Sequence, residues 1–125
     1  MEVKKDYLNQ LICAKYIFFK GTEILEKAGP FSSGISTNLF QDSVELILRT
    51  IVAHFEITPP KRDWTFHSMI EKINALEDRV LTHVSDINQL NKTRVNFKHY
   101  GVEPKSEFAL KFRNDLEGFI PTTLK

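Results

Sequence analysis

The segment Leu90–Gly101, LNKTRVNFKHYG, carries the side chains whose types and spacing are best suited to chemistry. It contains no carboxylate, although the whole chain holds 17 Lys+Arg against 16 Asp+Glu. Arg94 offers a planar fork of N–H donors that fits a phosphate, and Lys98 adds a compact positive charge. His99 can transfer a proton near neutral pH. The segment therefore predicts phosphate recognition beside a group that moves protons.

The pattern of this segment predicts the end of a helix. With about 100° per residue, Asn91 and Lys98 project within a turn of Arg94, whereas His99 lies about 140° around from it. We expect Gly101 to cap the helix and to let the His99 ring turn inward. A phosphate-binding arginine and a proton-transferring histidine suffice to cleave RNA without a metal, because the neighbouring 2′-OH supplies the nucleophile. DNA lacks this hydroxyl and would be spared.

The elements that must position this segment are also helical, because apolar residues recur mostly at three- and four-residue spacing and no segment shows convincing strand alternation. Three segments separate these elements: GPFSSG, ITPPKRD and VEPKS. We expect Gly29 in the first of them to form a left-handed cap, and PTTLK to be a loose end. We expect helices over about residues 3–28, from Ser36 or Thr37 to Phe55, from Asp63 to Leu76, from Ser85 or Asp86 to Gly101, and over 107–120. The predicted fold class is all-α: an up-and-down bundle of about five helices with no sheet.

The expected second helix is apolar almost all round, with one side formed by Phe40, Val44, Ile47, Ile51 and Phe55. Such a helix belongs near the centre of a bundle. Asp42, Glu45 and Arg49 form a narrow polar stripe opposite that side. The stripe has two interpretations: a solvated edge with a Glu45–Arg49 pair, or a polar surface that faces the fourth helix. In the fourth helix, the core side is expected to hold Ile87, Leu90 and Phe97, with Val95 elsewhere.

Length and composition predict a single domain over residues 1–125, and the alternative of one domain within a longer protein stays open. Cys13 lies in an apolar stretch, which indicates a buried thiol in a reducing compartment, so we expect a cytoplasmic protein. We expect no membrane contact, since even VELILRTIVAHF is interrupted by Arg49. The aromatic residues of the first helix predict core and subunit interface rather than a base-stacking platform; they are Tyr7, Tyr16, Phe18 and Phe19.

The remaining histidines, His54, His67 and His83, are dispersed without the spacing of metal ligands. The glycines are isolated and form no phosphate loop. We therefore expect no metal and no other cofactor.

The string LNKTRVNFKHYG resembles the signature of HEPN domains, all-helical proteins whose hallmark is an arginine followed after four to six residues by a histidine. Arg94 and His99 have that spacing, and Leu90, Asn91, Lys98 and Gly101 are similar to a common bacterial form of the signature. LFQDSVEL, in the second helix, also looks like the corresponding part of this group. The resemblance covers these two helices by residue pattern and the rest of the chain by helical plan.

The resemblance implies a metal-independent endoribonuclease of toxin–antitoxin or phage-defence type, in which two subunits join their motifs in one composite site. Arg94 would stabilise the scissile phosphate and His99 would be the acid and base. Substrate-binding roles would fall to Lys98, Asn91, Asn96 and Tyr100, supported by the stripe of Asp42, Glu45 and Arg49. RNA, a second copy of the chain, and an antitoxin or a larger defence protein are the expected partners.

Two alternatives to the nuclease remain. Active HEPN domains commonly have Asn, Asp or His after the arginine, where this chain has Val95. Val95 therefore favours a non-catalytic helical module for dimerisation or for RNA or protein binding within a larger defence or regulatory system. A third hypothesis, recognition of duplex DNA by the basic helix, is disfavoured by the nearly balanced charge.

Overall fold

The computed structural model describes residues 5–59, 63–76 and 84–123. These ranges hold five α-helices and no strand: α1 (Lys5–Lys27), α2 (Ser32–His54), α3 (Phe66–Asn74), α4 (Val84–Tyr100) and α5 (Ser106–Thr123). The predicted all-α bundle is therefore confirmed. No helix within these ranges is long and apolar enough to cross a membrane.

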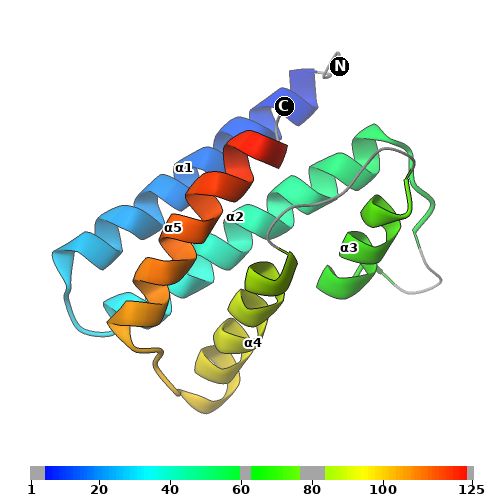
Figure 1. Ribbon diagram of the computed structural model, residues 1–125. Coiled ribbons are helices and arrows are strands. Elements are labelled where there is room, and N and C mark those ends of the chain that lie inside the picture. Colours follow the sequence, from blue (N-terminus) through cyan, green and yellow to red (C-terminus); the bar gives the residue numbers. More distant parts are fainter. Residues whose placement is uncertain (1–4, 60–62, 77–83, 124–125) are drawn as a thin grey trace.

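Helix α2 is the central element of the bundle. It contacts each of the other helices, and in Figure 1 it runs between α1 on one side and α3 and α4 on the other, with α5 beside α1. Phe40, Val44 and Ile47 are completely buried, while Ile51 and Phe55 are half-buried. A helix that is apolar almost all round is stable where its neighbours cover most of its surface, as predicted for this one.

The end of α1 differs from the prediction. Ala28, and not Gly29, has the left-handed backbone, with a φ of 49°. Phe31 is also left-handed, with a φ of 58°, and comes directly before the first residue of α2. The chain therefore reverses through two left-handed residues that are not glycine, which sequence patterns do not anticipate because such conformations are uncommon for these residue types.

Helix α2 begins at Ser32, one turn before the caps predicted at Ser36 and Thr37. The hydroxyls of Ser36 and Thr37 donate to the carbonyl of Ser33 at 3.1 and 2.7 Å, inside the helix. Serine and threonine can bond to a preceding carbonyl of their own helix as well as cap a following one. The prediction of a cap at either residue is wrong for this reason.

Helix α3 is capped by Thr65 and not by the predicted Asp63. The Thr65 hydroxyl accepts a hydrogen bond from the Ser68 amide at 3.0 Å, and the Ser68 hydroxyl accepts one from the Thr65 amide at 2.9 Å. This reciprocal capping box satisfies two amides that the helix leaves unpaired. Asp63 instead accepts from the amide of Trp64 at 2.7 Å.

Helix α4 begins at Val84, so Ser85 and Asp86 lie in its first turn and not at its cap. Its end agrees with the prediction. Gly101 has a φ of 67° and its amide donates to the carbonyl of Phe97 at 3.0 Å. This is the left-handed cap that glycine forms without steric cost.

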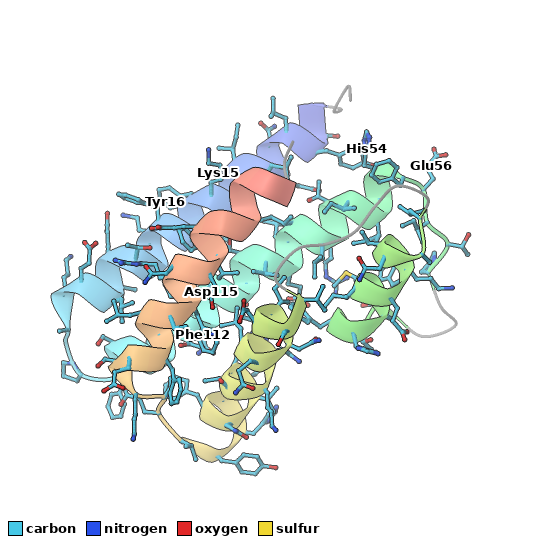
Figure 2. The ribbon with its side chains drawn as sticks, in the orientation of Figure 1. Lys15, Tyr16, His54, Glu56, Phe112 and Asp115 are labelled. Carbon is cyan, nitrogen blue, oxygen red and sulfur yellow. The ribbon has the colours of Figure 1, made fainter. Side chains whose placement is uncertain are left out.

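Helix α5 runs from Ser106 to Thr123, past the predicted end at residue 120. The prediction of a loose end from Pro121 onward is wrong as far as Thr123. Proline fixes φ close to the helical value, so a final turn can contain one and keep helical dihedral angles. Phe112, labelled on α5 in Figure 2, is 2% exposed and belongs to the hydrophobic core.

The aromatic residues of α1 divide into a half-buried and an exposed set. The Phe18 ring packs on the Phe40 ring with centroids 5.3 Å apart, in agreement with a role in the core. Tyr16 and Phe19 are 60% and 57% exposed, and Figure 2 shows Tyr16 pointing out from α1. Their assignment to a subunit interface stays a prediction.

The prediction of a buried thiol at Cys13 is wrong, because this side chain is exposed. Its neighbour Ala14 is completely buried. Adjacent helix positions are rotated by about 100°, so a residue beside a core position can face solvent even in an apolar stretch.

Candidate functional site

Arg94 lies between α4 and α2. Its Nη2 donates to Oδ1 of Asp42 on α2 at 3.1 Å, and its side chain is only 23% exposed. Asp42 thus faces the fourth helix, in agreement with the second interpretation of the polar stripe. A guanidinium that is held by a carboxylate and largely covered has few alternative rotamers, so Arg94 is fixed in position before any ligand arrives.

A second polar pair lies beside Arg94. The Gln41 amide donates from Nε2 to Oδ1 of Asn91 at 3.0 Å, and Gln41 is only 1% exposed. Three buried polar atoms have no hydrogen-bond partner in the described part of the chain: Oδ1 of Asn38, Oε1 of Gln41 and Nε of Arg94. We call Asn38, Gln41, Asp42, Asn91 and Arg94 the polar seam between α2 and α4.

The charge of Asp42 is tuned by its surroundings. Burial raises the pKa of its carboxyl above the ordinary value of 3.8, Arg94 lowers it, Glu45 raises it and Lys98 lowers it, in decreasing order of effect. The net direction is upward, so loss of water around the carboxyl, together with repulsion by Glu45, outweighs the attraction of the two cations. Lys98 is therefore close enough to the polar seam to act on it electrostatically.

The rest of the polar stripe is a separate surface. Glu45 pairs with Arg49 at 3.5 Å, and Arg49 also approaches Asp63 before α3 at 3.8 Å. Glu45 and Arg49 thus form the pair expected of a solvated edge. The two interpretations of the stripe each hold for a part of it: Asp42 faces α4, while Arg49 belongs to a surface ion-pair network.

Beyond the polar seam, the end of α4 is open. Lys98 and His99 are exposed and Tyr100 is 76% exposed, with its ring centroid 6.4 Å from that of His99. The expected inward turn of His99 is wrong: the Gly101 cap redirects the backbone, but the exposed imidazole follows the outer side of the helix. The structure thus brings Arg94 and Asn91 together in the seam, with Lys98 near enough to act on Asp42 electrostatically, and leaves His99 and Tyr100 outside it.

Asn96 belongs to a third surface. It lines a hollow with Thr93 of α4 and Phe108 of α5, about 200° around the helix from Arg94. Val95 is 39% exposed between these two sides, so its apolar side chain contacts neither the seam nor the hollow directly. Asn96 cannot take the place of a polar residue after the arginine at the same phosphate.

Sequence reasoning missed Asn38 and Gln41. Both are polar residues within the apolar second helix, and a buried polar side chain inside such a helix is a signal of a specific partner. It also missed the residues after Gly101 that close the hollow, because no residue pattern there indicates how the chain folds after the cap. His83 lies outside the described residues, and His67 pairs with Glu71 on α3 at 3.3 Å.

No group of three or more His, Cys, Asp or Glu side chains that could hold a metal ion occurs among the residues that the structure describes. The chain matches no protein-family model, and no curated protein or solved structure is significantly similar to it. What the site can do chemically therefore follows from its own side chains. It offers a fixed guanidinium, a neighbouring ammonium and an exposed imidazole, which together suit an anionic ligand with a transferable proton.

Proposed function

We propose that this protein is a metal-independent endoribonuclease of HEPN type that acts as a dimer in a toxin–antitoxin or phage-defence system. The observation that carries the proposal is Arg94, a guanidinium held by Asp42 at 3.1 Å on the same helix that exposes Lys98 and His99 at its end. A cation fixed before the ligand binds stabilises charge that develops on a phosphate without reorganising.

The reaction needs no group that these side chains lack. His99 removes the proton of a ribose 2′-OH, the oxygen attacks the adjacent phosphorus, and the bond to the 5′-oxygen of the next nucleotide breaks. A protonated imidazole returns the proton to that leaving oxygen. Arg94 and Lys98 balance the negative charge on the non-bridging oxygens. The products are a 2′,3′-cyclic phosphate and a 5′-hydroxyl.

A dimer follows from the placement of the two central residues. His99 lies about 140° around α4 from Arg94, so one chain does not direct both at the same phosphate. A two-fold pairing of α4 ends would bring the Arg94 of one protomer beside the His99 of its partner. A protein that stays monomeric at high concentration in solution scattering would contradict this part of the proposal.

Cleavage of a labelled RNA in the presence of EDTA tests the activity, with Arg94→Ala and His99→Gln compared to the native protein. We expect each variant to lose about 100-fold or more in rate, because each removes one central function. His67→Gln, an exposed histidine on α3, and Lys15→Ala, an exposed cation on α1, are matched controls that should keep the native rate.

Cyclic phosphate ends on the native products, together with loss in both variants and retention in both controls, would support the nuclease. Equal rates in all folded proteins would assign the cleavage to a contaminant and overturn the proposal.

The Asp42–Arg94 pair favours a second candidate, a non-catalytic module that binds RNA or a protein. Asp42 already accepts from Nη2, one of the groups with which Arg94 would bind a phosphate. Asp42→Asn would release Arg94, so tighter RNA binding without any cleavage would favour the binding module. Tighter binding with faster cleavage would favour the nuclease.

A further inference from the structure

The hollow between α4 and α5 is created by the way α4 ends. Gly101 reverses the chain with its φ of 67°, and the Val102 amide donates to the Asn96 carbonyl at 3.3 Å. The following residues fold back along α4 until α5 begins at Ser106. The result is a hollow of about 210 Å³ beside the last turns of α4.

The lining of the hollow combines an aromatic face with polar edges. Phe108, which is 52% exposed, and Val102 supply the apolar surface. Gln89 and Asn96 supply amides. Glu103 supplies a carboxylate at the rim.

An aromatic face with amide and carboxylate groups at its edges suits the binding of one unstacked base. Bases of single-stranded RNA stack on exposed aromatic rings and form hydrogen bonds through their edges to amide and carboxylate groups. Pockets for drug-sized ligands measure about 300–1,000 Å³, so a hollow of about 210 Å³ is better matched to a single ring system. Lys105 lies at the same rim and can contact the attached phosphate.

The position of the hollow also relates it to the motif. Around α4, Arg94, His99 and Asn96 follow one another at about 0°, 140° and 200°. The exposed His99 therefore lies between the guanidinium and the hollow. A strand that places a phosphate at the end of α4 can reach the hollow with a neighbouring base.

We propose that this hollow binds one base of single-stranded RNA and prefers a base with an exocyclic amino group. The proposal rests on the proposed function, since it names the part of the substrate that this end of α4 selects. The preference follows from Glu103, because a carboxylate accepts a hydrogen bond from the amino group of cytosine, whereas uracil has a carbonyl there. Cytosine and uracil have rings of the same size, so stacking contributes similarly to both.

The experiment measures fluorescence anisotropy of 2′-O-methylated oligo-C and oligo-U in EDTA, so that binding is observed without cleavage. We expect Phe108→Ala to weaken binding about tenfold or more, as loss of a stacking ring does. Phe108→Trp should retain binding, which separates loss of the ring from a loss of fold. Phe19→Ala is the matched control, because Phe19 on α1 is 57% exposed and should leave binding unchanged.

Glu103→Gln tests the preference separately. Native protein should bind oligo-C more tightly than oligo-U, and the variant should reduce the ratio towards one. An unchanged ratio, or an initial preference for oligo-U, would overturn the amino-group preference.

The hollow and the nuclease can fail independently. If RNA binding depends on Arg94 and is unchanged in Phe108→Ala, the proposal for the hollow is overturned, whereas the proposal of a nuclease is not. Binding that depends on Phe108, together with no cleavage of unmodified RNA, would support the hollow and overturn the nuclease. A third outcome is that neither oligonucleotide binds and that a peptide or protein binds at Phe108 instead. This outcome would overturn the hollow as an RNA site.

Discussion

Helix α4 has polar side chains on two sides, and the two sides differ in what surrounds them. Toward α2, Arg94 and Asn91 are paired with Asp42 and Gln41 in a seam in which Gln41 is buried and the other three are half-buried. Toward the start of α5, Asn96 borders an open hollow. The first side resembles a packed interior in which polar groups fix the helix in place. The second has the open polar groups of a binding surface. The same helix thus supplies position with one side and contact with the other.

The sharpest test of this difference is one substitution made on both sides of α4. Asn91→Leu removes the partner of the Gln41 amide, which is 1% exposed, so we expect the free energy of unfolding to fall by about 1–3 kcal/mol. Asn96→Leu gives the same gain in helix propensity but leaves no buried group unpaired, so we expect a change within about 0.5 kcal/mol. Urea denaturation measures the free energy of unfolding of both variants. Equal losses in the two variants would contradict the difference between the two sides of α4.

A smaller effect on stability is expected from adding a methyl group where α2 and α4 pack closely together. A methyl group on Gly34 would overlap the ring of Phe97, whereas one on Gly29 would meet nothing within 4 Å. Overpacking costs about 1–3 kcal/mol, and replacing a helical glycine returns up to about 1 kcal/mol. We expect Gly34→Ala to be destabilised and Gly29→Ala to be nearly neutral in the same denaturation experiment. A stabilised Gly34→Ala would mean that α4 adjusts freely against α2.

The smallest expected effect concerns Asp42 and pH. Burial, the largest influence, raises the pKa of its carboxyl above 3.8 despite Arg94. Protonation then favours the folded state, and that contribution is lost as the pH rises through the pKa of the folded protein. We expect the stability of the native protein minus that of Asp42→Asn to decrease as the pH increases between about 3 and 6. A difference that increases with pH would show that pairing with Arg94 outweighs burial.

The bundle and the central place of α2 could be predicted, because they follow from apolar periodicity within each segment. The pairing of Gln41 with Asn91 could not, since it depends on how two helices are rotated against each other. Cys13 was misplaced for a related reason: its apolar neighbours did not reveal which side of α1 faces solvent. Arg94 could be selected as a candidate from the sequence, because its side chain type decides what it can bind. The hollow after Gly101 could not, because the course of the backbone decides it.

The reversal between α1 and α2 has a kinetic consequence. Only residues 28–31 separate the two helices, so closing this loop costs little chain entropy and the hairpin can form early in folding. At that stage the sides of α2 that later contact α3, α4 and α5 are still uncovered. Helix α2 also carries Val44 and Ile47, which are completely buried at the end of folding. We therefore expect a nascent hairpin to be the species most prone to self-association, and the arrival of α4 and α5 to end that exposure.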